Sequence, residues 1–497
     1  MAIERIGIVG AGTMGAGIAL TALYADMDVI LYDLYPEMLE KAQGYIEKFL
    51  KKRDMADRIG KLTLSEELGA MAKAEVVIEA ALEDLAVKQE IFAQLDAICN
   101  EEAILATNTS TIAVTSIAAD TAHPQRVAGM HFFNPAPLMQ LVEVIKASQS
   151  SHATIETLVK LAKQLDKTPV ICKDSPGFIV NRVARPYYLE AMRIASEGIA
   201  TFEQIDTVMQ LGGGFRMGPF RLMDLIGIDI SLAASTSIYQ QTFNEPRFRP
   251  SLIQAQMVQA KTLGRKTGKG FYDYSDNASE FTLPDIPEKE RQKGRVNSRI
   301  ANGLAARCRD IGYTVATAVR DARFWIADTE SELPGVPSPS VIVFTNAGTI
   351  SQRRVQRKFA TRIVPTIGYD DFLLESAQLV TLVNNPSFRE SEIEEVEAFF
   401  AHMGLAVMWM NDSRGLILTR IISQIINEAA FAVGEGVADM ATIDVAMKLG
   451  VNYAAGPFEW GKQIGYHRIV SVLDNLYDYY HEDRYRVAPH LRRLADS

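Results

Sequence analysis

The chain has 497 residues, which is longer than one hydrophobic core ordinarily supports, so its length predicts several domains. A net charge of -10 argues against a nucleic-acid partner, and the apolar runs are shorter than the roughly 20 residues that a membrane helix needs. The three cysteines show neither CxxC spacing nor a nearby histidine cluster, so we expect no disulfide and no metal site. The first residues lack signal-peptide features, and the expected location is the cytoplasm.

The N-terminal segment has the pattern of a dinucleotide-binding motif. An apolar run at residues 5–9 predicts a buried strand, and Gly10, Gly12 and Gly15 follow it in GxGxxG spacing. These glycines permit a tight turn, close approach of a pyrophosphate and close packing of the next helix on the strand. Asp33 ends a second apolar run and is placed to accept hydrogen bonds from a ribose, which favours NAD over NADP. The alternative is a purely structural turn.

Strands and helices then alternate, which predicts a Rossmann-type, doubly wound α/β domain. Further strands are expected at 76–78, 103–107, 127–130 and 141–145, with helices starting near residues 36 and 85. In such a sheet, ligands bind beyond the carboxyl ends of the strands. The segment 108–110 and His131 both follow strand ends, so we expect them to face the nicotinamide.

His131 is the candidate general base for alcohol oxidation, because histidine titrates in the required range. Glu143 lies within an apolar run, where a carboxylate is costly without a partner, and is the candidate that orients the imidazole. Alternatively, His131 is a packing residue and Ser110 caps a turn.

Together these segments resemble the 3-hydroxyacyl-CoA dehydrogenase family. The resemblance extends over about residues 3–275, and includes residues 10–15, 108–110, HFFNP at 131–135, LVEVI at 141–145, 174–182 and 264–272. It implies an all-α, 6-phosphogluconate-dehydrogenase-like domain after the α/β domain. It also implies NAD as cofactor and a 3-hydroxyacyl-CoA thioester as substrate.

The resemblance further implies roles for individual residues. His131 would be the general acid/base, Glu143 its partner, Ser110 and Asn181 the groups that hold the reacting oxygen and thioester, and Asn134 a residue that positions the His131 loop. The implied NAD-binding residues are Gly10, Gly12, Met14, Gly15, Asp33, Glu83, Lys88 and Asn108. The basic run 48–53 is either a site for the CoA phosphates or a solvated helix face.

The second half of the chain repeats the first. An offset of 238 residues places Asp174 on Asp412 and Arg182 on Arg420, with frequent identities between. The same offset places Thr107 on Thr345 and Leu141 on Leu379, which indicates a shortened second α/β copy. The expected division is a NAD-binding domain at 1–181, a helical domain at 182–280, a degenerate α/β domain at 281–400 and a second helical domain at 401–497.

The second copy has lost the chemistry-bearing residues. The repeat replaces Ser110 by Gly348, Glu143 by Thr381 and Asn181 by Thr419, and an ungapped register places Tyr369 at the position of His131. The GxGxxG counterpart is expected at 296–301, without glycine at the three positions. We therefore expect this half to be inactive, and to replace the partner of a homodimer within one chain or to shape the acyl pocket.

The sequence thus predicts an NAD-dependent 3-hydroxyacyl-CoA dehydrogenase that needs neither nucleic acid nor membrane. Bacterial members of the resembled family with this two-copy layout often serve phenylacetate or related aromatic degradation, which implies a dicarboxylic, 3-hydroxyadipyl thioester. A short acyl chain, as in fatty-acid β-oxidation, is the other expectation. Arg185 and Arg216 are candidates for binding a distal carboxylate. The alternatives are a 3-hydroxy-acid dehydrogenase with a lysine base and a non-enzymatic NAD- or CoA-binding protein.

Overall fold

The structure is a computed structural model, and it describes residues 3–276, 278, 280–300, 302–317, 321–327, 341–346 and 365–497. The chain divides into two compact units. The first comprises Met1–Val183 and Ala432–Asn452, and the second comprises Ala184–Phe431 and Tyr453–Ser497. Gly348, the predicted counterpart of Ser110, lies outside the described residues.

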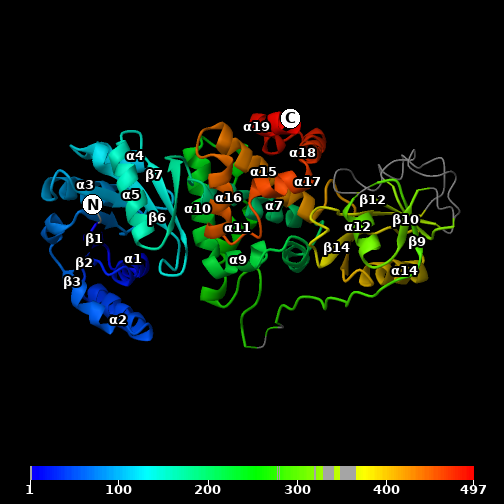
Figure 1. The fold of residues 1–497 in the computed structure, drawn as a ribbon, viewed down its shortest axis with the longest axis horizontal. Coiled ribbons are helices and arrows are strands. Elements are labelled where there is room, and N and C mark those ends of the chain that lie inside the picture. The colour runs from blue at the N-terminus through cyan, green and yellow to red at the C-terminus, as the bar shows by residue number, and fades with distance from the viewer. Residues whose placement is uncertain are drawn as a thin grey trace. The chain divides into compact units, whose positions relative to one another are not determined.

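The first unit is built on an eight-stranded sheet in the order β3-β2-β1-β4-β5-β6-β7-β8 (Figure 1). Its strands are parallel except for the antiparallel β6–β7 pair. Apolar runs form these strands because helices cover a parallel sheet on both faces. Their bounds are β1 Arg5–Val9, β2 Asp28–Tyr32, β3 Leu62–Ser65, β4 Val76–Glu79, β5 Ile104–Thr107, β6 Val127–Phe132, β7 Leu141–Lys146 and β8 Thr168–Lys173.

The helices of the first unit come from both halves of the sequence. Those from the first half are α1 Thr13–Tyr24, α2 Pro36–Lys52, α3 Leu85–Ile98, α4 Val114–Ile117, α5 His152–Gln164 and α6 Val180–Val183. From the second half, α16 Met440–Gly450 packs on β7, β8 and α6. A segment that the repeat assigns to the second helical copy is therefore part of the unit that holds the first sheet.

The second unit contains a seven-stranded sheet in the order β10-β9-β11-β12-β13-β14-β15 (Figure 1). This order repeats the first sheet without a counterpart of edge strand β3. The strand bounds are β9 Arg295–Ser298, β10 Thr314–Ala316, β11 Phe324–Ile326, β12 Ile342–Asn346, β13 Thr366–Tyr369, β14 Leu379–Val383 and β15 Ala406–Met410. Helices α12 Gly303–Asp310 and α14 Glu390–Ala401 belong to this copy.

The remaining helices of the second unit come from the two helical copies. Those of the first copy are α7 Arg185–Ser196, α8 Phe202–Thr207, α9 Pro219–Ile226, α10 Ile228–Gln241 and α11 Leu252–Gln259. Those of the second are most of α15 Ile417–Gly434, together with α17 Pro457–Ile464, α18 Tyr466–Tyr480 and α19 Pro489–Ala495. By length and composition α15 is apolar enough to span a membrane, but 89% of that window is buried inside the structure, as expected for a core helix.

The structure corrects the predicted counterpart of His131. Thr107 pairs with Gly129 in the first sheet, whereas Thr345 pairs with Gly368 in the second, so the connection into β13 is one residue longer. The amide of Asp370 donates to the carbonyl of Thr381 at 3.1 Å, which places Asp370 opposite the counterpart of Glu143. The prediction of Tyr369 was wrong by one position, because the ungapped register fails in that connection.

The predicted position of the second glycine turn was also wrong. Val296 lies inside strand β9, and helix α12 begins after Asn302 as α1 begins after Gly12. The side chain of Asn302 accepts the amide of Ala305 at 3.0 Å, whereas no side chain caps α1. An N-terminal amide that is free in α1 is therefore already bonded in α12.

Asp370 is a buried carboxylate with several donors. It accepts hydrogen bonds from the hydroxyl of Thr419 at 2.7 Å, from the amide of Thr419 at 3.1 Å and from the amide of Phe372 at 3.1 Å. Burial raises the pKa of Asp370 to about 6 from 3.8, and the charge of Asp371 adds to this increase. In the second copy, the position that corresponds to His131 is therefore occupied by a carboxylate that is hydrogen-bonded to Thr419 and Phe372.

We predict that Asp370→Asn changes the pH dependence of stability. Because the folded pKa is raised, protonation stabilises the folded state fully below about pH 4, and this contribution is lost as pH rises through about 6. From pH 4 to 7, the free energy of unfolding of the wild type should fall relative to the variant by up to about 3 kcal/mol. Urea titrations of both proteins at the two pH values measure this change. If wild type and variant differ in free energy of unfolding by the same amount at pH 4 and at pH 7, the raised pKa of Asp370 is contradicted.

Candidate functional site

The glycine turn after β1 leaves room for a phosphate. Gly10 has a φ of 103°, and a Cβ on it would lie 2.7 Å from the carbonyl oxygen of Ala80. A Cβ on Gly15 would lie 1.8 Å from the carbonyl oxygen of Gly10, so only glycine lets α1 approach this closely. A Cβ on Gly12 would meet nothing within 4 Å. The uncapped N-terminus of α1 and the open space at Gly12 fit the pyrophosphate of a dinucleotide.

Asp33 connects this turn to the end of β2. One carboxylate oxygen accepts the amide of Ala11 at 2.7 Å, and the other accepts the amide of Tyr35 at 3.0 Å. The carboxylate thereby supports the glycine turn and fixes the chain that follows β2. Its position after β2 fits a residue that binds the ribose hydroxyls. Met14 follows in the first turn of α1 and packs partly buried against the core.

A buried ion network lies at the carboxyl ends of β4 and β5. The Nζ of Lys88 is 2.7 Å from Glu79 and 3.3 Å from Glu83, and Lys88 and Glu79 are almost fully buried. The hydroxyl of Thr107 donates to the second oxygen of Glu79 at 2.7 Å. This network holds Glu83 at the edge of the sheet with its side chain 39% exposed.

Glu83 organises the turn that contains Ser110. It accepts the amide and hydroxyl of Ser110 at 2.9 and 3.3 Å, and also receives hydrogen bonds from Thr109 and Thr111. Burial alone would raise the pKa of Glu83, but the Lys88 charge and these donors hold it below its usual value. The carboxylate is therefore ionised at neutral pH and fixes the Ser110 turn.

His131 and Glu143 form a buried pair on adjacent strands. They lie opposite each other in the β6–β7 ladder, and Nδ1 of His131 is 2.7 Å from Oε2 of Glu143. Glu143 is 0% exposed and His131 is 6% exposed. Oε1 of Glu143 accepts the amides of Ile179 and Val180, each at 3.0 Å. The carboxylate cannot rotate without breaking these bonds, so it fixes the imidazole with Nε2 as the remaining ring nitrogen.

The other predicted site residues link this pair to the Ser110 turn. The side-chain oxygen of Asn108 accepts the amide of Phe132 at 2.8 Å, which joins the end of β5 to the end of β6. The side-chain nitrogen Nδ2 of Asn181 donates to the backbone carbonyl of Ser110 at 3.4 Å. Asn181 directly follows Val180, so one turn contacts both Glu143 and Ser110. The structure therefore brings His131, Glu143, Ser110, Asn181 and Asn108 together.

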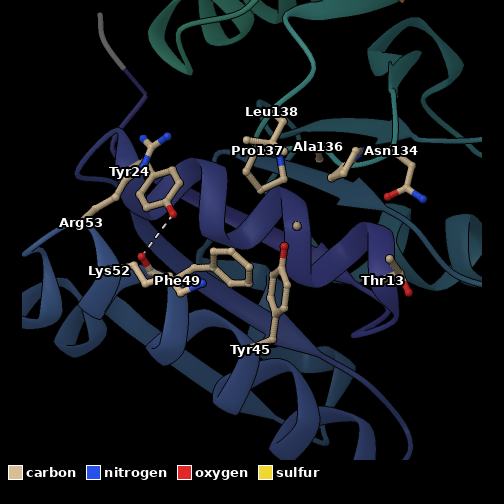
Figure 2. Close-up of a pocket in the computed structure, with 12 residues that line it drawn as sticks. Thr13, Tyr24, Tyr45, Phe49, Lys52, Arg53, Asn134, Ala136, Pro137 and Leu138 are labelled. Atoms are coloured by element: carbon tan, nitrogen blue, oxygen red, sulfur yellow. Dashed lines mark hydrogen bonds between the residues drawn. The ribbon is translucent and has the colours of Figure 1, made fainter.

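A pocket of about 480 Å³ lies between α1, α2 and the loop 134–138, which follows the strand that carries His131 (Figure 2). Asn134 and Thr13 lie toward one end, and Lys52 and Arg53 toward the other, as Figure 2 shows. Between these two ends, the pocket is lined by the aromatic side chains of Tyr24, Tyr45 and Phe49. Of the basic run 48–53, only Lys52 and Arg53 contribute cations to this pocket.

The sequence analysis missed two carboxylates that organise the site. Glu79 holds Lys88, and Asp174 accepts the amides of Val114 and Thr115 at 3.1 and 2.7 Å at the start of α4. Glu79 ends the apolar run of β4, which is the same signal of a buried carboxylate that identified Glu143. Asp174 gave no such signal, because it lies in a polar loop.

Comparison with known proteins identifies the same organisation. The family model "3-hydroxyacyl-CoA dehydrogenase, NAD binding domain" matches residues 5–175. The model "3-hydroxyacyl-CoA dehydrogenase, C-terminal domain" matches residues 177–274 and again 415–497. The helical domain is thus present twice, and a degenerate second α/β copy lies between.

Two kinds of relative match the chain. The 3-hydroxyadipyl-CoA dehydrogenase of Escherichia coli K12 is 36% identical and aligns over 99% of this chain and 98% of its own. The mitochondrial hydroxyacyl-coenzyme A dehydrogenase of Rattus norvegicus is 41% identical and matches 55% of this chain and 91% of its own.

Solved structures likewise include a full-length and a half-length relative of this chain. The 3-hydroxybutyryl-CoA dehydrogenase of Escherichia coli K12 has a TM-score of 0.85, with 34% identity and coverage of 100% of this chain and 98% of that one. The (S)-3-hydroxybutyryl-CoA dehydrogenase of Ralstonia eutropha has a TM-score of 0.53, with 39% identity and coverage of 55% of this chain and 100% of that one. The chain therefore belongs to the 3-hydroxyacyl-CoA dehydrogenase family and is an NAD-dependent 3-hydroxyacyl-CoA dehydrogenase.

Proposed function

We propose that His131 is the general acid/base of this dehydrogenase and that Glu143 is its partner. The observation that carries the proposal is the buried 2.7 Å contact between Nδ1 of His131 and Oε2 of Glu143. This contact leaves Nε2 to take the proton of the substrate hydroxyl, and the carboxylate stabilises the imidazolium that forms. When bound, NAD accepts the hydride from C3, so the alcohol becomes a ketone.

The Ser110 turn and Asn181 are proposed to hold the reacting end of the thioester. Ser110 and Asn181 are linked at 3.4 Å and flank the His131–Glu143 pair through Asn108 and Val180. Glu83 would hold the turn and contact the nicotinamide end of NAD, and Lys88, which is 1% exposed, would act on the cofactor through its ion pair with Glu83. Gly10, Gly12, Met14, Gly15 and Asp33 would lie at the other end of NAD. Asn134 would position the loop that follows His131.

The pocket in Figure 2 is proposed to accommodate part of the CoA moiety. Lys52 and Arg53 supply cations for phosphate groups at one end, and the aromatic wall offers apolar contact along the middle. Asn134, three residues beyond His131, lines the same pocket. The arrangement supports a thioester that enters with its reactive carbon toward His131.

The acyl chain is proposed to be short or dicarboxylic, in fatty-acid β-oxidation or phenylacetate degradation. The full-length relatives are named for 3-hydroxyadipyl-CoA and 3-hydroxybutyryl-CoA. Of the arginines considered for a distal carboxylate, Arg185 is 5% exposed and donates to Ser235, whereas Arg216 is exposed. We further propose a cytoplasmic enzyme without nucleic-acid or membrane partners. We also propose two α/β and two helical domains, with strand β15 Ala406–Met410 in the second α/β domain, beyond the boundary at 400 predicted from the sequence.

His131→Gln should lower kcat by about 10²–10⁴-fold without altering NADH affinity, because the amide can neither take the hydroxyl proton in the oxidation nor give a proton to the carbonyl oxygen in the reduction. Loss of NADH absorbance with acetoacetyl-CoA measures turnover, and fluorescence titration measures binding. His123→Gln is the matched control, since His123 also bonds a carboxylate, Asp96, through Nδ1 at 3.2 Å, but at another place in the domain. An unchanged rate in His131→Gln would overturn the assignment of the base.

Asp33→Asn should raise the KM for NADH about tenfold and reduce the ratio of kcat/KM for NADH to that for NADPH. A hydrogen bond to a charged group contributes about 1.5–3 kcal/mol, and the neutral amide no longer repels a 2′-phosphate. Initial rates with both cofactors test this. The control is Asp28→Asn, which removes a half-exposed ion pair between Asp28 at the start of β2 and Arg5 at the start of β1. Retained discrimination in the Asp33 variant would argue against its ribose contact.

Acetoacetyl-CoA or 3-oxoadipyl-CoA should be reduced with a higher kcat/KM than a long-chain 3-oxoacyl-CoA. Initial rates across such a series test the acyl-chain proposal directly. A long-chain thioester that outperforms both would refute it and leave the reaction class unchanged.

A further inference from the structure

The turn between β8 and α6 presents the two amides that hold Glu143, and its backbone is unfavourable by itself. Phe178 has a φ of 49°, which a bulky residue rarely adopts, and Gly177 has a φ of 76°. Such a conformation persists only where surrounding contacts enforce it. Phe178 is 1% exposed, and its ring centroid is 6.0 Å from that of His131. The shape of this turn therefore bears directly on the His131–Glu143 pair.

Residues of the second half of the chain contact both ends of this turn. Before it, the amide of Lys173 donates to the carbonyl of Val437 at 2.9 Å. After it, the guanidinium of Arg182 lies 2.8 Å from the carboxylate of Glu435. Arg182 also closes the turn itself, because its amide donates to the carbonyl of Gly177 at 3.0 Å. All of these residues belong to the first compact unit.

Helix α16 packs against the middle of the same turn. A Cβ on Gly450 would lie 2.9 Å from Val180 and 2.8 Å from Leu141. Val180 donates one of the two amides to Glu143, and Leu141 begins the strand that carries Glu143. Helix α16 therefore packs directly on the side chains of Val180 and Leu141, as closely as a glycine allows.

The repeat reproduces these contacts with the two copies exchanged. In the second unit, Gly212 of the first helical copy faces Leu418 and Leu379, the counterparts of Val180 and Leu141. Glu197 likewise pairs at 3.1 Å with Arg420, the counterpart of Arg182. Each α/β copy is thus completed by the helical copy of the other half, but only the first retains a base at the place these contacts support.

We propose that Glu435 is a positioning residue of the active site, through which the catalytically degraded half maintains catalysis in the first. Arg182 is 3% exposed, its guanidinium donates to the hydroxyl of Ser175 within the turn at 3.3 Å, and the half-exposed carboxylate of Glu435 contributes to holding it there. Without this carboxylate the turn loosens, the amides of Ile179 and Val180 lose their alignment with Glu143, and the imidazole is less well oriented. The inference rests on the proposed roles of His131 and Glu143.

The test compares Glu435→Gln with Glu197→Gln in the full-length enzyme. We expect Glu435→Gln to lower kcat by about 10- to 100-fold, because a small misplacement of a catalytic group has effects of this size. The KM values and the NADH dissociation constant should stay within about twofold of wild type. Glu197→Gln is the matched control, because it changes the mirror-related pair with Arg420 in the second unit, whose α/β copy has Asp370 at the position of His131. Its kcat should be that of the wild type.

Hydrogen exchange provides a readout that needs no substrate. Peptides spanning residues 174–182 should exchange faster in Glu435→Gln than in wild type and unchanged in Glu197→Gln. Glu435→Asp, which keeps the charge, should restore part of both kcat and protection, and it serves as the test protein if the glutamine variant does not fold.

Two results would overturn the inference: wild-type kcat and exchange in Glu435→Gln, or equal losses in both glutamine variants. Failure of the proposed function shows up separately, as unaltered turnover in His131→Gln.

Discussion

The buried carboxylate of Glu143 is the constraint on which the rest of the active site depends. A charge that is 0% exposed is costly unless each oxygen has partners, and here one oxygen binds His131 and the other binds two amides. These partners come from the neighbouring strand and from a turn far along the chain. Satisfying one charge therefore fixes the relative positions of β6, β7 and the turn before α6.

The second copy shows what happens to this arrangement when the chemistry is lost. The carboxylate is again buried and again bonded by the chain that begins the helical domain, but it is Asp370, at the place of the histidine, bonded by Thr419. The link between strand and helical domain survives without a base. The fold requires the anchor, and only the first copy combines it with an imidazole.

The sequence predicted the elements whose signal is local. The apolar runs and glycines around residues 5–33 indicate a nucleotide-binding fold, and Glu143 in an apolar strand indicates a buried partner. Fine register was less accessible: Tyr369 was placed where Asp370 lies, because a one-residue difference in a connection leaves no trace in an ungapped comparison. The contact of Glu435 with Arg182 was also missed, since nothing near either residue indicates a partner some 250 positions away.

The exchange of helical segments between the copies gives a physical reason why the decayed half persists. A half-length relative matches about 55% of this chain and is a dehydrogenase in its own right, so the extra half is not needed for the chemistry as such. In this chain, however, Gly450 and Glu435 are packed against the turn that serves Glu143. Loss of the glycines and the base from the second copy leaves the first active site unchanged, whereas loss of α16 would expose β7 and β8. Selection on the first site alone is then sufficient to preserve residues 432–452 of the second helical copy while the second α/β copy degenerates.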